Sequence, residues 1–257
     1  MIEARHIEKS FDGRVILHDI TAKFYEGKTN LIIGQSGSGK TVLMKSLVGL
    51  IKPEKGEILY DGRDFMKFNS EETRLLRSEI GMLFQGSALF DSMTVIENVM
   101  FPLLMFTDQT YQERRKRAEF CLERVNLKGA DKLHPSELSG GMQKRAAIAR
   151  AIALNPKYLF CDEPNSGIDP RTSLVIDALV SDITHEYNIT TIINTHDMNS
   201  VMGIGENIIF LNKGHLDWQG TKEEIFTSKS ESLNDFVFAS NLLKEVREYV
   251  VSKNSRQ

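Results

Sequence analysis

The segment GQSGSGKT at Gly34–Thr41 constrains the fold of this chain more than any other feature of its sequence. It matches a phosphate-binding loop, because glycines let the backbone curl its N–H groups around an anion without side chains in the way. A short apolar run, Asn30–Ile33, precedes the loop as a candidate buried strand, and a helical pattern over Val42–Leu50 follows it. The N–H groups that open such a helix also bind anions. The sequence therefore predicts a strand, a phosphate loop and a helix in succession.

The residues of this loop have different predicted roles. Lys40 is expected to reach the β- and γ-phosphates of a nucleotide, and the hydroxyl of Thr41 is expected to ligate Mg²⁺. The other residues are expected to surround the phosphates of ATP: Gly34, Gln35, Ser36, Gly37, Ser38 and Gly39. The alternative is a chance glycine-rich turn, which would not explain the strand before it and the helix after it.

A second segment, Tyr158–Glu163 (YLFCDE), ends an apolar strand in two carboxylates. Open α/β sheets bind ligands at the carboxyl ends of their strands, so we expect Asp162 to hold Mg²⁺ or its water shell. Glu163 is expected to be the general base for an attacking water. Alone, such a pair is more often a solvated strand end. Together with the phosphate loop, it predicts hydrolysis of Mg-ATP.

A third segment, LSGGM at Leu138–Met142, opens another helix. Ser139, Gly140 and Gly141 form a second helix start suited to anions, and the helix carries Lys144, Arg145 and Arg150. One nucleotide scarcely needs two anion-binding helix starts from one chain. We therefore expect a homodimer in which each chain contributes this element to the ATP site of the other. An ordinary flexible helix start is the alternative, and the sequence leaves open whether the contact lies within or between chains.

The order of elements predicts an α/β fold. Short strands joined by turns occupy the chain up to Tyr60, helical patterns dominate from about Gly86 to Ala153, and strands alternate with helices after Pro156. We expect a mainly parallel sheet in a single domain over residues 1–257, with a helical subdomain inserted at about 86–155. A C-terminal helical tail is expected over about 231–257, with large apolar residues at helical spacing at Phe236, Leu243, Val246 and Val250.

Composition narrows the functional classes. The net charge of -3 provides no basic field for nucleic acid. Cys121 and Cys161 are far apart, which argues against a disulfide framework or a zinc site. The apolar stretch Val99–Phe106 is far shorter than the roughly 20 residues that cross a bilayer. If the protein serves a membrane process, we expect another chain to do the spanning.

The order of these motifs resembles the ATP-binding subunits of ABC transporters over essentially the whole chain. It runs from the glycine loop through Gln85 after a strand, LSGGM and the Asp-Glu pair to His196 after a strand. The resemblance implies a P-loop NTPase core with a mainly parallel sheet, an N-terminal antiparallel β subdomain and an inserted helical subdomain.

The resemblance also implies roles for Phe11, Gln85 and His196. Without it, Phe11 would be explained as a core residue, Gln85 as a strand end and His196 as a loop histidine. Phe11 would stack on adenine. Gln85 would contact Mg²⁺ or water and sense a membrane partner, and His196 would touch the γ-phosphate. Ser166–Asp169 (SGID) would link the two ATP sites, with Asp169 reaching toward the partner's ATP.

A closer resemblance lies in GMLFQGSALFDSMTVIENV, PSELSGGMQKRAAIARAIAL and DEPNSGIDP. These segments are similar to the ATPases of Mla-type phospholipid transporters, the MlaF group. This implies an MlaE-type permease and an MlaD-like MCE-domain lipid carrier as partners, at the inner face of a bacterial inner membrane. Met142, where glutamine is commoner, is shared with this group, whereas Asn165 and Gly167 depart from the usual residues of their loop.

Two other functions stay open. One is a transporter ATPase for another solute, such as an amino acid or a peptide. The other is a soluble ABC protein of repair or translation, which usually needs two ATPase halves or a long coiled coil. The segment Ser87–Phe106 carries many large apolar residues. They are expected either to form a groove for a permease helix or to pack inside the helical insertion.

Overall fold

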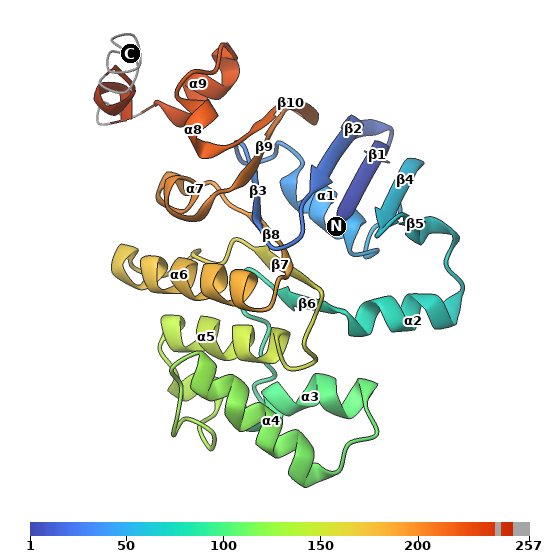
Figure 1. The fold of residues 1–257 in the computed structure, drawn as a ribbon, viewed down its shortest axis with the longest axis vertical. Coiled ribbons are helices and arrows are strands. Elements are labelled where there is room, and N and C mark those ends of the chain that lie inside the picture. The colour runs from blue at the N-terminus through green and yellow to red at the C-terminus, as the bar shows by residue number, and fades with distance from the viewer. Residues whose placement is uncertain (240–242, 249–257) are drawn as a thin grey trace. The chain divides into compact units, whose positions relative to one another are not determined.

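A computed structural model describes residues 1–239 and 243–248, which divide into two compact units (Figure 1). The first unit contains Met1–Tyr25, Thr29–Met66 and the described chain from Asn194 onward. The second contains Glu26–Lys28 and Lys67–Ile193. The phosphate loop belongs to the first unit, whereas the Asp-Glu pair and the LSGGM segment belong to the second.

The first unit is built on two sets of strands. Its strands are β1 (Ile2–Phe11), β2 (Arg14–Phe24), β3 (Thr29–Ile33), β4 (Lys55–Tyr60), β5 (Arg63–Asp64), β9 (Asn207–Asn212) and β10 (His215–Gly220). One set is antiparallel in the order β2-β1-β4-β5, as predicted for the N-terminal part. In the other, β9 pairs in parallel with β3 and antiparallel with β10. The helices of this unit are α1 (Lys40–Leu47), α7 (Met198–Ile204), α8 (Lys222–Ile225) and α9 (Glu231–Val237). The 3-10 turn η1 (Phe65–Lys67) lies where the chain passes from the first unit to the second.

The second unit combines a parallel sheet with helices. Its strands, β6 (Ile80–Leu83), β7 (Tyr158–Asp162) and β8 (Thr190–Asn194), lie in the order β8-β7-β6, and β6 and β7 are parallel. All residues of β7 and β8 are buried, which explains their continuous apolar character. The helices are α2 (Ser70–Ser78), α3 (Val95–Phe106), α4 (Tyr111–Arg124), α5 (Gly140–Ala151) and α6 (Pro170–Glu186), with the 3-10 turn η2 (Pro135–Glu137) before α5. The α/β prediction is thus confirmed.

Short polar residues begin two of the helices. Asn69 Oδ1 accepts hydrogen bonds of 2.9 Å from the N–H groups of Glu71 and Glu72, and the Glu72 carboxylate accepts the Asn69 N–H at 2.9 Å. The Asp169 carboxylate accepts the Thr172 N–H at 3.0 Å and so caps α6. Short polar side chains therefore set the starts of both helices locally.

The helix after the phosphate loop is shorter than predicted. It ends at Leu47 rather than Leu50, because Gly49 takes a φ of 74° that ends a helix. The Gly49 N–H donates to Ser46 O at 3.1 Å and the Leu50 N–H donates to Lys45 O at 2.9 Å. This hydrogen-bond pattern is the Schellman motif, which satisfies the last carbonyls of a helix.

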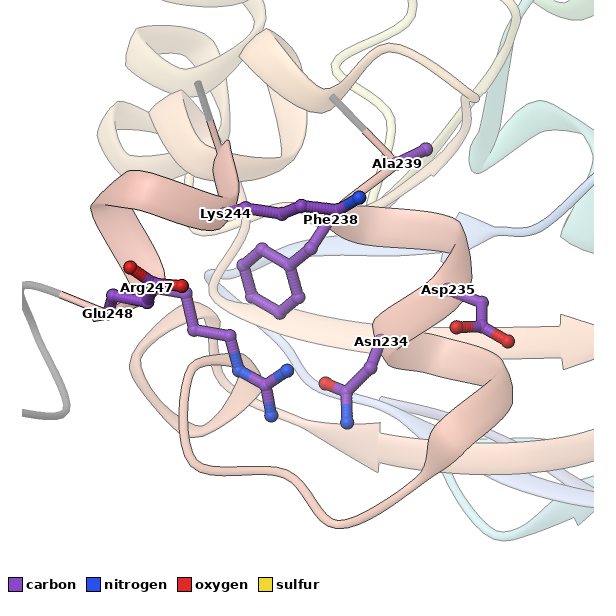
Figure 2. Close-up of a pocket in the computed structure, with 7 residues that line it drawn as sticks. All are labelled: Asn234, Asp235, Phe238, Ala239, Lys244, Arg247 and Glu248. Atoms are coloured by element: carbon purple, nitrogen blue, oxygen red, sulfur yellow. The ribbon is translucent and has the colours of Figure 1, made fainter. Parts of the chain in front are cut away.

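The C-terminal tail differs from the single helix that we predicted. α9 ends at Val237, and residues 243–248 form a separate helical segment. Phe238, the residue after the last turn of α9, is buried, and its ring centroid lies 5.8 Å from that of Phe226. The Arg247 guanidinium lies 4.9 Å from the centroid of the Phe238 ring (Figure 2). Val250 lies outside the described residues.

Between β6 and β7, where every residue is described, the chain forms helices and no strand. α3, α4 and α5 pack on one another, and α5 also contacts α6 (Figure 1). The insertion of helices is therefore as predicted, while its extent as a subdomain over about 86–155 stays a prediction. Within the described part of the chain, no helix combines the length and the apolar character needed to cross a bilayer.

Candidate nucleotide site

The phosphate loop leaves a fully buried strand, β3, and its first glycine is required by close packing. Gly34 has a φ of 149°, and a Cβ at this position would lie 2.2 Å from Leu211 O and 2.7 Å from Ser38 Oγ. No other residue fits there without moving the backbone of β9. The Ser38 N–H donates to Gln35 O at 3.1 Å, which closes the loop on itself.

The start of α1 differs from those of the longer helices. Its N-cap residue, Gly39, makes no side-chain hydrogen bond to the first turn. Side chains cap the other helices of comparable or greater length: α2 by Asn69, α3 by Thr94, α4 by Thr110, α5 by Ser139 and α6 by Asp169. Ser38 Oγ is buried and has no hydrogen-bond partner among the residues that the structure describes. Open N–H groups and a buried hydroxyl suit the oxygens of a phosphate.

Lys40 folds back over the loop that precedes it. Its side chain is only 7% exposed, and Nζ donates to Gly34 O at 2.8 Å and to Gln35 O at 3.0 Å. The ammonium group is thus held at the concave side of the curled backbone. Thr41, the next residue, is exposed at the start of α1. Both positions are compatible with the phosphate and Mg²⁺ roles predicted from the sequence.

Phe11 and His196 belong to the same unit as this loop. Phe11 ends β1 with 43% of its surface exposed, and Lys9 Nζ lies 5.0 Å from the ring centroid. The Thr195 N–H donates to Ile32 O at 3.1 Å, so the chain passes the end of β3 immediately before the exposed His196. An exposed aromatic face and a histidine beside the strand that enters the loop are compatible with the roles that the resemblance implies.

In the second unit, the Asp-Glu pair ends the buried strand β7. Asp162 is 7% exposed, and Glu163 has a left-handed φ of 50°. This conformation is uncommon outside glycine and costs of order 1–3 kcal/mol. The Ser166 N–H donates to Glu163 O at 3.1 Å and stabilises the sharp turn after the pair. Strain of this kind clusters at functional sites, which favours a chemical role for Glu163.

Gln85 meets the loop that follows Glu163. β6 and β7 are parallel, so the residues that follow both strands lie at one edge of the sheet. Gln85 Nε2 accordingly donates to Ser166 Oγ at 3.4 Å. The sequence predicts both residues as part of the site but does not predict this contact.

The rest of this loop is tied to α6. Asn165 Nδ2 donates to Asp177 Oδ1 at 2.8 Å, which gives a local role to one of the two residues that depart from the family pattern. The hydroxyl and the N–H of Thr172 donate to the Asp169 carboxylate and hold the pKa of that carboxyl below its usual range. In the isolated chain, Asp169 therefore serves as a helix cap.

The LSGGM segment opens α5 at the surface of the second unit. Ser139 Oγ accepts the Met142 N–H at 3.3 Å, and Ser139 and Gly140 are exposed. A Cβ on Gly141 would lie 2.5 Å from Thr172 Cγ2, so this glycine allows α5 to approach α6. The segment is thus an ordinary capped helix start within one chain, with an exposed face at Ser139 and Gly140.

Two basic side chains of α5 have roles that sequence reasoning missed. Lys144 Nζ donates to Gln85 O, and Arg150 donates to Ser87 O at 2.8 Å and to Ala88 O at 2.7 Å. Both residues are recognisable in the sequence as part of a basic helix. Their contacts with the loop after β6 depend on tertiary packing and leave no local signal.

Three comparisons identify the family. The sequence profile described as ABC transporter matches residues 17–166. The chain is 37% identical over 237 residues to the intermembrane phospholipid transport system ATP-binding protein MlaF of Haemophilus influenzae, covering 92% of this chain and 90% of that protein. It is 38% identical over 236 residues to a probable ribonucleotide transport ATP-binding protein, mkl, of Mycobacterium leprae, covering 92% of this chain and 68% of that protein. For the mkl protein of Mycobacterium tuberculosis, the covered share is 66%.

A solved structure with the same fold is a dimeric, post-hydrolysis state of the ATP-binding cassette MJ0796 bound to ADP and Pi. It is 33% identical, has a TM-score of 0.79, and covers 86% of this chain and 98% of its own. The fold, the order of the motifs and these similarities agree: this chain belongs to the ABC transporter family, as one of its ATP-hydrolysing subunits.

Proposed function

We propose that this chain hydrolyses Mg-ATP to drive phospholipid transport, together with an MlaE-type permease and an MCE-domain lipid carrier at the inner face of a bacterial inner membrane. The observation that carries the lipid proposal is the similarity to MlaF over nine tenths of both chains. The methionine after the paired glycines and the segment around Gln85 support it. ATP hydrolysis itself follows from the family.

In this proposal the site residues predicted from the sequence bind one ATP. The loop N–H groups of Gly34–Thr41 and the ammonium of Lys40 bind the phosphates, and Phe11 stacks on adenine. Asp162, Thr41 and Gln85 would hold Mg²⁺, which supplies positive charge between the phosphate oxygens. One carboxylate with two neutral oxygen ligands suits this ion, because Mg²⁺ usually keeps waters and substrate oxygens in its other positions.

Hydrolysis then needs a base and a charge at the γ-phosphate. Glu163 accepts a proton from water while the water oxygen bonds to the γ-phosphorus and the bond to the leaving ADP oxygen breaks. His196 donates a hydrogen bond to the γ-phosphate. A positioned base contributes roughly 10²–10⁴-fold to such a rate.

We infer that two copies bind two ATP at their interface. Ser139, Gly140 and Gly141 of one copy contact the ATP of the other, and Asp169 lies beside them. The exposure of Ser139 and Gly140 supports this arrangement, as does the dimeric state of the similar cassette. Binding-driven closure followed by release after hydrolysis makes the dimer a two-state element.

Substitution of Glu163 and Lys40 tests the chemistry. The variant Glu163→Gln should bind ATP and accumulate as an ATP-held dimer with turnover reduced at least a hundredfold, measured by phosphate release and size exclusion. Lys40→Ala should instead lose ATP affinity or turnover without forming that dimer. Near-normal hydrolysis by Glu163→Gln would exclude Glu163 as the base.

The surface proposed to bind the permease lies in the segment 87–106. Some apolar side chains of this segment are buried and others are exposed. Val95, Val99 and Leu103 of α3 are buried and pack the helices. Phe90 is 41% exposed, and Leu104 is 57% exposed. The buried side chains pack the helical insertion, and the exposed ones are the candidates for docking.

Charge substitution tests this docking surface. Phe90→Asp should abolish co-purification of the permease from native membranes and leave the ATPase activity of the free chain unchanged. Leu174→Asp, at a side chain that is 58% exposed on α6, is the matched control. Co-purification of Phe90→Asp at the wild-type level would refute the surface.

The main alternative is transport of another solute, such as an amino acid or a peptide, and the relative named for ribonucleotide transport favours keeping it open. Mass spectrometry of the complex purified through this chain should identify an MCE-domain protein. ATP-dependent transfer of a fluorescent phospholipid between vesicles, absent with Glu163→Gln, then tests the substrate. A periplasmic solute receptor in the complex would refute lipid transport.

A further inference from the structure

The loop after β6 is held to α5 by cationic side chains. Lys144 is only 4% exposed, and its Nζ donates to the backbone carbonyl of Gln85. Arg150, two turns further along the helix, donates to Ser87 O and Ala88 O. Ser87 and Ala88 have left-handed φ values of 63° and 49°, so these bonds stabilise a strained backbone.

A buried ammonium group is costly where an apolar side chain would fill the same volume. Burial lowers the pKa of Lys144, while the negative charges of Glu163 and Asp162 act in the opposite direction. Its Nζ donates a hydrogen bond to Gln85 O, a neutral backbone carbonyl. Packing alone therefore does not explain a lysine at this position.

We propose that Lys144 is a positioning residue for ATP hydrolysis: its hydrogen bond to the Gln85 carbonyl fixes Gln85 to α5. The assignment rests on the roles of Gln85 and Glu163 proposed above. Arg150 anchors only the far part of the loop, whereas Lys144 holds Gln85 itself.

This contact has a consequence for coupling. α5 begins at Ser139, which we propose to contact the ATP of the partner copy, and Gln85 precedes the segment proposed to face the permease. Nζ of Lys144 joins the two elements directly within one chain. In this proposal, a shift of α5 on dimer closure moves the backbone of Gln85 through its hydrogen bond with Lys144.

Two substitutions of the full chain test the assignment. Lys144→Met keeps the length of the side chain but removes the charge and the donor, and Lys144→Arg keeps both. We expect Lys144→Met to lower kcat roughly tenfold or more, as for a lost charged hydrogen bond, with the Kd for ATP within about twofold of wild type. Its Tm should not fall, since a buried charge has been removed. Lys144→Arg should recover most of kcat.

Hydrogen exchange supplies a readout that a purely structural role would not produce. In Lys144→Met, amides of residues 84–90 should exchange faster while those of α5 keep their wild-type protection. The control is Lys116→Met, at an exposed lysine of α4, which should change neither measurement.

Two results would overturn the assignment. One is a kcat for Lys144→Met within twofold of wild type. The other is a fall of Tm together with loss of protection along α5, which would show that Lys144 only supports the helix. Glu163→Gln is measured in parallel: full hydrolysis by that variant would refute the proposed base, while the comparison of Lys144→Met with Lys144→Arg would still decide the role of Lys144.

Discussion

Gly34 offers a direct test of the packing that shapes the phosphate loop. In Gly34→Ala, the new Cβ would lie 2.2 Å from Leu211 O, a backbone atom of β9 that cannot rotate away. Real Cβ contacts are not found below 3.0 Å, so the strand or the loop must move. The left-handed φ adds about 1–2 kcal/mol of strain and the overlap about 1–3 kcal/mol, so we expect a loss of about 2–5 kcal/mol in the free energy of unfolding.

Gly37→Ala separates the two contributions. Gly37 has a φ of 79°, but nothing lies within 4 Å of a Cβ built there. This variant should lose only the strain, about 1–2 kcal/mol. For a chain of this size, 1 kcal/mol lowers the Tm by roughly 2–4 °C, so Gly34→Ala should melt roughly 4–20 °C below wild type and well below Gly37→Ala.

The assay is thermal and urea denaturation of both variants and wild type without nucleotide, followed by circular dichroism. Unfolding without nucleotide isolates the packing cost from any effect on ATP binding. Equal stability of Gly34→Ala and Gly37→Ala would refute the reasoning, because the contact with Leu211 O would then carry no cost.

Three further predictions concern other parts of the chain. Phe11→Ala should weaken binding of a fluorescent ATP analogue roughly tenfold, and Phe11→Tyr should not, since base stacking is worth about 1–3 kcal/mol; equal affinities would exclude stacking. Burial raises the pKa of Cys161 to about 12 and of Cys121 to about 11, so Ellman's reagent at pH 8 should label neither thiol until the protein unfolds. The Thr172 hydroxyl lowers the pKa of Asp169 in the folded state, so its stabilisation is complete above the unfolded pKa and is lost as the pH falls through the folded one. In a pH series, Asp169→Asn should therefore reduce the fall of Tm toward acidic pH. An unchanged pH dependence of Tm would contradict the prediction.

Much of the site could be predicted because its signals are local. Gly34–Thr41 lies between a buried strand and a helix, as its pattern requires, and the starts of α2 and α6 follow from Asn69 and Asp169. Each of these signals involves groups only a few residues apart. Backbone sterics and capping hydrogen bonds act over that range, so the sequence shows them directly.

The ends of two helices were predicted less well than their starts. The extent of α1 was overestimated because Gly49 ends it through a Schellman motif, although the apolar pattern continues to Leu50. The tail was predicted as one helix because its apolar spacing is helical. In the structure α9 ends at Val237, and the next residue, Phe238, is buried beside Phe226.

The sequence by itself identified this chain as an ABC ATPase and predicted where its chemistry lies: a phosphate loop at Gly34–Thr41, the carboxylates Asp162 and Glu163, and a helix start at Ser139 that we propose to contact the partner's ATP. Only the tertiary structure decided how Gln85 is held, by Ser166 through its side chain and by Lys144 through its backbone. The physical reason is that parallel pairing of β6 with β7 and the packing of α5 bring together residues far apart in the chain. Neither the register of a sheet nor the burial of a lysine has a local sequence signal.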